Sequence, residues 1–168
     1  MPHTRLLCAI GVSLWSVVVA GSQAVAPAVL SEALRDHVKN DRFGIVTSIR
    51  GLPLGVRNEL QEMFDSQNTL DINMDIAEPG AEFQATDVIV NPQLPIRRLV
   101  AAGCTIEYCL VYYERGGIAH TWQVALFHWT PAATRFEWGG AAPGGLLTID
   151  DVRNAILSGV IKGPAKFW

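Results

Sequence analysis

The chain has 168 residues, 49% of them hydrophobic, and its 13 lysines and arginines are outnumbered by 16 acidic residues, which gives a formal net charge of −3. This length fits a short leader followed by one domain with a sizeable core. Arg97-Arg98 is the only adjacent basic pair. The acidic balance therefore argues against nucleic acid or an anionic membrane surface as a partner, because both are bound through clustered Lys and Arg.

The first residues have the features of a secretory signal peptide, which we predict over residues 1–26. A single basic residue, Arg5, precedes an apolar run over 6–20 that ends in small residues. That run has about 15 residues, whereas a membrane span needs roughly 20. We therefore expect a protein that is periplasmic or secreted, with no stable membrane insertion once the signal is removed.

Three alanines are candidates for the cleavage site, namely Ala24, Ala26 and Ala28. Cleavage needs small side chains just before the cut, and Pro27 is a poor residue just after it, so Ala24 and Ala28 are favoured over Ala26. The remainder, residues 27–168, is predicted to form a single globular domain.

Hydrophobic periodicity predicts the elements of the first half of this domain. Apolar residues at helical spacing indicate one helix over 29–39 and another over 53–65, with Pro53 in its first turn. Period-two alternation and β-rich composition predict strands, over 43–49, 70–76, 83–90 and 96–102. A Pro-rich turn separates the last two of these strands.

The stretch 106–129 predicts a central β-hairpin, because two long β-rich runs meet at Gly116-Gly117. A two-residue turn at these glycines would place Tyr113 opposite His120. The same register would pair three further positions, Arg115 with Ile118, Val111 with Trp122 and Cys109 with Val124.

The C-terminal part predicts a strand over 134–138, a Gly-rich connector over 139–145, and a closing helix. Thr148 and Asp151 have the spacing of a capping box, and Gly159 is a typical helix stop. The predicted fold is therefore α+β: an antiparallel sheet of about five or six strands with three short helices, built on the central hairpin 106–129. We expect all three helices to cover one face of that sheet.

Two cysteines, Cys104 and Cys109, follow the predicted signal peptide. Because their number is even, we expect them to form one disulfide in an oxidising compartment. In the chain-entropy model so short a loop contributes about 2 kcal/mol. An alternative joins both thiols to His128 as zinc ligands, because the predicted register brings residue 128 opposite residue 105.

Two other metal patterns are weaker. Asp71, Asn73, Asp75 and Glu82 have the oxygen spacing of a calcium loop, but Ile76 stands where the motif needs Gly. The solvated face of a strand explains these residues equally well.

His120 and His128 share a predicted strand face, yet eight residues of strand separate them by about 26 Å, too far for both to bind one metal ion. We therefore predict neither a metal site nor a cofactor.

His120 is the one acid–base candidate, with Glu114 close by at the turn end of the hairpin. A half-exposed histidine without a catalytic role explains the same position. The chain has no Gly-x-Ser-x-Gly and no His-Glu-x-x-His motif. A small envelope hydrolase that uses His120 with Glu114 or another carboxylate is therefore the alternative function.

Aromatic residues concentrate in the predicted sheet, where they occur at Tyr108, Tyr112, Tyr113, Trp122, Phe127, Trp129, Phe136 and Trp138. Core packing accounts for most of them, but an open sheet face could recognise an envelope protein, peptide or glycan. Tyr112, Trp122 and Trp129 are the predicted binding residues. The leading function is a non-enzymatic binding or interaction module. A flat aromatic patch would support it, whereas a concave pocket where His120 meets a carboxylate would support the hydrolase.

Overall fold

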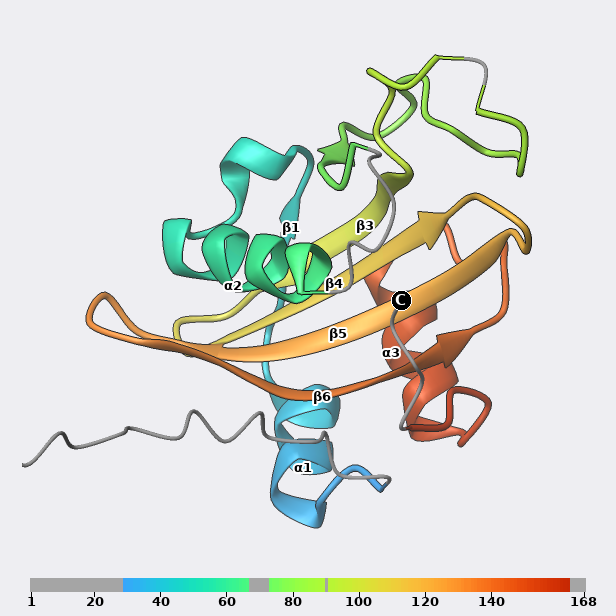
Figure 1. The fold of residues 1–168 in the computed structure, drawn as a ribbon. Coiled ribbons are helices and arrows are strands. Elements are labelled where there is room, and N and C mark those ends of the chain that lie inside the picture. The colour runs from blue at the N-terminus through green and yellow to red at the C-terminus, as the bar shows by residue number, and fades with distance from the viewer. Residues whose placement is uncertain (1–28, 67–72, 90, 164–168) are drawn as a thin grey trace, which may run out of the picture.

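The computed structural model describes residues 29–66, 73–89 and 91–163 (Figure 1). The predicted signal peptide and its cleavage sites lie outside these residues. The elements follow in the order α1 (Glu32–Asn40), β1 (Gly44–Val46), the 3-10 turn η1 (Ile49–Gly51), α2 (Leu54–Asp65), β2 (Ile76–Ala77), β3 (Arg97–Cys104), β4 (Tyr108–Arg115), β5 (Thr121–Trp129), β6 (Thr134–Ala142) and α3 (Ile149–Leu157).

The strands form one six-stranded sheet in the order β1-β3-β4-β5-β6, with the short β2 paired parallel to β3. The pairings along the main order are all antiparallel. Together with three helices, this sheet confirms the predicted α+β class. Among the described residues, no helix is long and apolar enough to cross a membrane.

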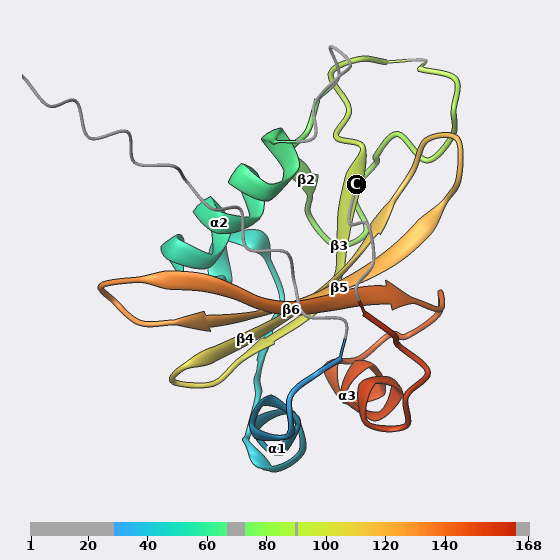
Figure 2. The ribbon, with the colours of Figure 1, turned by 60° about the horizontal axis from the view of Figure 1, so that its bottom comes forward.

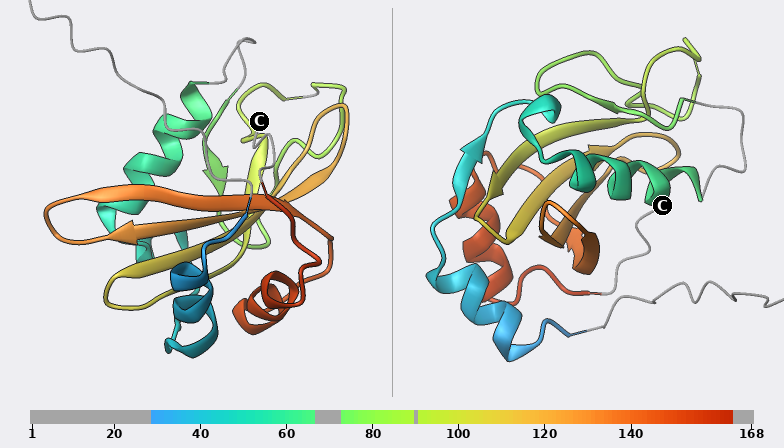
Figure 3. Two further views of the ribbon diagram at one scale, coloured as in Figure 1. Left: turned by 90° about the horizontal axis from the view of Figure 1, so that it is seen from below. Right: turned by 90° about the vertical axis from the view of Figure 1, so that its left-hand side faces the viewer.

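The helices cover both faces of the sheet, so the prediction that all three share one face was wrong (Figures 2 and 3). Helix α2 packs on one face against a core that includes Val111 and Tyr113. Helices α1 and α3 pack on the other face against Leu110 and Tyr112. Because successive residues of β4 point to opposite faces and are apolar on both, each face needs its own cover.

Local signals in the sequence account for where the helices begin. Thr148 and Asp151 form the predicted capping box at the start of α3. The Ser31 side chain accepts a hydrogen bond from the backbone N–H of Leu34 and so caps α1. Pro53 stands at the N-cap of α2. These local signals explain why the helices were predicted more closely than the loops.

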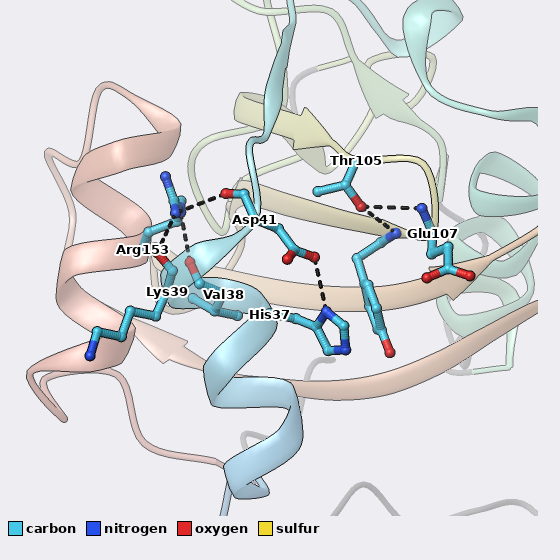
Figure 4. A network of polar contacts seen from close by, with 8 residues as sticks. His37, Val38, Lys39, Asp41, Thr105, Glu107 and Arg153 are labelled. Carbon is cyan, nitrogen blue, oxygen red and sulfur yellow. Dashed lines mark hydrogen bonds and ion pairs between the residues drawn. The ribbon is translucent and has the colours of Figure 1, made fainter.

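Arg153 of α3 joins this helix to the end of α1 (Figure 4). Its guanidinium donates to the carbonyl oxygens of Val38 at 2.8 Å, Lys39 at 3.0 Å and Asp41 at 3.1 Å. The last carbonyls of a helix have no partner within the helix, and its dipole favours a cation there. Arg153 therefore fixes the relative position of the two helices that cover this face.

The strand predicted over 83–90 is wrong for the residues that are described, because 83–89 form an irregular loop. The Nε2 atom of buried Gln84 donates to the carbonyl oxygens of Thr86 and Val88 in the same loop. These bonds curl the chain on itself and compete with an extended conformation. Of the strand predicted over 70–76, only Ile76 belongs to β2, and 70–72 lie outside the described residues.

The predicted hairpin is present as β4 and β5, but its register differs by three residues. Tyr113 pairs with Gln123 instead of His120, and the turn holds residues 116–120. Because side chains alternate along a strand, an odd shift exchanges the faces. Tyr113 therefore lies on the α2 face and does not approach His120 as predicted.

Gly116 explains why the turn is longer than two residues. Its N–H donates to the carbonyl of Ile96 at 2.9 Å. A Cβ atom at this position would lie only 1.9 Å from the carbonyl oxygen of Gln84, so the backbone of Gly116 is packed directly on the 83–89 loop. The reversal of the chain occurs beyond it, where Gly117 has a φ of 106°.

Strand β6 is longer than the predicted strand 134–138, because it continues through Gly139 and Gly140 to Ala142. A Cβ on Gly140 would lie 2.8 Å from the Ile161 side chain. The glycines that suggested a flexible connector are thus part of the sheet, where another segment of backbone packs closely over them.

Candidate functional site

Cys104 and Cys109 form the predicted disulfide, with their Cα atoms 4.1 Å apart at paired positions of β3 and β4. The zinc alternative needs both sulfurs as thiolates, and the bond between them removes these ligands. His128 lies opposite Tyr108 instead of residue 105, with ring centroids 5.2 Å apart.

The calcium pattern is not assembled among the described residues. The Asn73 amide donates to the carbonyl of Gln93, and its oxygen accepts from the backbone N–H of Asp75. Asp71 lies outside the described residues. In the part of the chain that the structure describes, no group of three His, Cys, Asp or Glu side chains is placed to hold a metal ion.

The structure does not bring Tyr112, Trp122 and Trp129 together on one surface. Tyr112 is fully buried beneath α1 and α3, and its hydroxyl donates to the carbonyl of Pro143 at 2.7 Å. Burial raises the pKa of Tyr112 to about 12. Trp122 lies on the same face and Trp129 packs against the core of the α2 face. The open aromatic face that was expected is therefore covered by helices.

Trp129 lines a groove of about 400 Å³ between α2 and the β5–β6 turn, which we call the Trp129 groove. Its walls are formed by residues 53–55, Asn58, Glu59 and Glu62 of the α2 region and by residues 130–134 of the turn. The indole Nε1 of Trp129 is buried and has no hydrogen-bond partner among the described residues. A tryptophan normally finds an acceptor for this N–H when it is buried.

Two glutamates give the Trp129 groove an acidic wall. Burial raises the pKa of Glu59, the neighbouring carboxylate of Glu62 raises it further, and a hydrogen bond from the backbone of Phe136 lowers it. Among the described residues, no Lys or Arg lines the groove. A cation placed between the glutamates would stabilise their charged forms.

His120 and Glu114, the predicted acid–base pair, do meet in the structure. His120 Nε2 lies 2.8 Å from Glu114 Oε2, and the other oxygen of this buried carboxylate accepts from Arg98 Nε at 2.6 Å. The His120 ring stacks on Trp122 with centroids 4.4 Å apart, and Phe83 contacts both His120 and Arg98. We call these five residues the His120 cluster.

The His120 cluster can hold a histidine in one orientation, because Glu114 fixes the Nε2 side of the ring. Within the described residues, no Ser, Thr or Cys hydroxyl or thiol forms a hydrogen bond with His120. Any reaction there would have to use water activated at Nδ1. His120 is 37% exposed in its side chain, and it does not line the Trp129 groove.

A second group of polar residues was missed by the sequence analysis. Four residues each carry a buried side-chain nitrogen or oxygen that has no partner among the residues described: Arg97, Tyr113, Arg115 and Gln123. We call them the arginine cluster. Arg97 and Arg115 pair directly across β3 and β4. Arg97 is two positions from buried Leu99, and Arg115 is two positions from buried Tyr113. Residues two apart in a strand share a face, so this spacing was the available signal that both charges lie on an inward face.

Comparison with known proteins adds no relative to these observations. No family model matches this chain, and no curated protein or solved structure matches it significantly.

Proposed function

We propose that this chain is an exported, non-enzymatic binding module of the cell envelope, and that the Trp129 groove recognises a basic peptide segment of an envelope protein. The observation that carries this proposal is a groove lined by the tryptophan Trp129 and by two glutamates, Glu59 and Glu62. Recognition sites are typically concave, with an aromatic anchor and a few convergent polar groups.

The charge of the groove favours a basic ligand. Glu59 and Glu62 line one wall, and burial already raises the pKa of Glu59. A lysine or arginine side chain would pair with these carboxylates, and its cation could also lie against the indole ring of Trp129.

Export is supported by two independent features. The N-terminal sequence has the pattern of a signal peptide. The Cys104–Cys109 disulfide is of the kind that persists in an oxidising compartment.

Calorimetric titration with a short peptide of alternating leucine and lysine tests the proposal. Trp129→Leu, and separately Glu59→Gln combined with Glu62→Gln, should each weaken binding by about 10-fold or more. Glu82→Gln, an exposed acidic residue outside the groove, serves as the matched control. Equal binding of a peptide with glutamate in place of lysine would contradict the proposal, and so would unchanged affinity in Trp129→Leu.

A hydrolase remains the second candidate, because of the 2.8 Å contact between His120 and buried Glu114. Hydrolysis of p-nitrophenyl acetate by the exported protein should then fall to the background rate in His120→Ala. His128→Ala is the matched control, since His128 lies on β5 outside the His120 cluster. Activity that survives His120→Ala would exclude this mechanism.

A further inference from the structure

The arginine cluster places two positive charges side by side in the interior. Arg97 and Arg115 are paired residues of neighbouring strands, and Arg97 is fully buried. Directly opposed residues of like charge destabilise a sheet. Within the part of the chain that the structure describes, four donors here have no hydrogen-bond partner: Nε and Nη2 of Arg97, Nε of Arg115 and the hydroxyl of fully buried Tyr113.

No carboxylate of the described residues forms an ion pair with Arg97 or Arg115. The nearest compensation for Arg97 comes from the carbonyl of Met74 at 3.4 Å, from the Phe64 ring at 4.0 Å and from the more distant charge of Asp65. Buried charges are normally paired, and buried donors are normally bonded. The arginine cluster is incomplete by both criteria.

A pocket of about 330 Å³ lies next to Arg115 of this cluster. It is lined by residues of the loop that precedes β3 and of the β4–β5 turn, and Figures 1 and 2 show these two segments side by side. Arg115 is its one cationic lining residue among those described, and Asp87 its one acidic residue. We call it the Arg115 pocket. Pockets of this volume accommodate small organic molecules.

The walls of the Arg115 pocket are mostly apolar. Ile89, Leu94, Ile96 and Ile118 contribute side chains, and Ile118 is 97% exposed at the turn. The amide nitrogen of Gln84, which also lines the pocket, already donates to carbonyls of its own loop. Asp87 is exposed. The combination of apolar walls with a cation fits a molecule that has an apolar body and one acidic group.

We infer that the Arg115 pocket binds a small amphipathic organic anion, whose carboxylate or phosphate monoester pairs with Arg115 and whose apolar body contacts the isoleucine walls. Arg97 is paired with Arg115 across β3 and β4, and its charge strengthens the attraction, because the interior screens charges weakly. Arginine suits this task, since its planar donors match the oxygens of both acid groups. This site is separate from the Trp129 groove and does not depend on its proposed role.

Calorimetric titration with three probes tests the inference: octanoate, octyl phosphate and uncharged 1-octanol. The two anions should bind about 10-fold to 100-fold more tightly than octanol, which is the range expected for hydrogen bonds to a charged group. The stronger of the two anions identifies the acid group. Equal affinity for octanoate, octyl phosphate and octanol, or no binding of either anion, would overturn the inference.

Arg115→Gln should remove the preference for anions and leave octanol binding unchanged. Arg42→Gln is the matched control, because it removes one exposed positive charge far from the pocket in the sequence. If Arg115→Gln fails to fold, the wild-type protein still decides the matter. Octanoate must shift the Nε–H resonance of an arginine side chain in a ¹H–¹⁵N spectrum, and octanol must not. A preference retained in Arg115→Gln, or an unshifted arginine spectrum, would refute the assignment.

Discussion

Exchange of Arg97 for Met is expected to stabilise the ligand-free protein, although it removes a fully buried side chain with several contacts. Burial lowers the pKa of Arg97 from its ordinary value to about 10, while Tyr113 and Asp65 raise it and Arg115 lowers it. Since one pKa unit corresponds to about 1.4 kcal/mol, the charged form of Arg97 costs the folded state about 3 kcal/mol. Met has a similar length and no charge.

The contacts of Arg97 offset part of this cost. The guanidinium lies 4.0 Å from the centre of the Phe64 ring, a cation–π contact worth about 2 kcal/mol when desolvated. Its 3.4 Å hydrogen bond to the carbonyl of Met74 is long and adds about 0.5 kcal/mol or less. The net expectation for Arg97→Met is a gain of about 1 kcal/mol, or roughly 2–4 °C in Tm.

The sign of the pH dependence follows from the lowered pKa. Below pH 10 Arg97 is charged in both the folded and the unfolded state, so its destabilising effect is fully present at neutral pH. The effect fades only as the pH rises above about 10 towards the ordinary pKa of an arginine. The advantage of Arg97→Met should therefore be constant between about pH 6 and 9.

Arg98→Met is the matched variant, because Arg98 is adjacent in sequence but points to the opposite face and pairs with buried Glu114. Its loss leaves a buried carboxylate without its arginine and should cost about 1–3 kcal/mol. Urea denaturation followed by circular dichroism at pH 7 measures both variants. A loss of stability in Arg97→Met as large as that in Arg98→Met would refute the reasoning from burial.

Three further predictions concern stability. Removal of the disulfide by Cys104→Ala with Cys109→Ala should lower the free energy of unfolding by about 2 kcal/mol in urea denaturation. Reduction of the wild-type protein should reproduce that loss, and a change below about 0.5 kcal/mol would contradict the prediction. Glu59→Gln should raise the Tm at pH 7, because the raised pKa of Glu59 means that its charge disfavours the fold. The gain should shrink as the pH falls below the ordinary pKa of a glutamate, since the residue then becomes neutral in both states, and a gain independent of pH would exclude that cause. Arg153→Met removes three hydrogen bonds to the end of α1 and should lower the free energy of unfolding by about 3 kcal/mol in urea denaturation. An unchanged free energy of unfolding would show that α1 is held by its apolar contacts alone.

The elements that could be predicted from the sequence are those specified by local chemistry. The capping box of Thr148 and Asp151 and the apolar stripe of α3 depend on residues within one or two turns. The disulfide could be predicted from two cysteines five positions apart. The proximity of His120 to Glu114 was expected as well. The expectation rested on a register that placed Tyr113 opposite His120, and that register was wrong.

The features that could not be predicted depend on contacts between distant segments. The length of the β4–β5 turn depends on the backbone of Gln84, 32 positions before Gly116. The arginine cluster was hidden because Arg97 and Arg98 are one basic pair in the sequence, whereas the sheet sends one to each face.

The close approach at Gly116 has a consequence for evolution and engineering of this protein. The carbonyl of Gln84 occupies the space where any other residue would carry its first side-chain carbon, 1.9 Å away. The loop before β3 and the β4–β5 turn therefore touch through bare backbone, and they are the two walls of the Arg115 pocket. Substitution of Gly116 by alanine would push these two segments apart. It would enlarge or distort the pocket while leaving its lining residues unaltered, so the selectivity of the site could change without mutation of any residue that contacts a ligand.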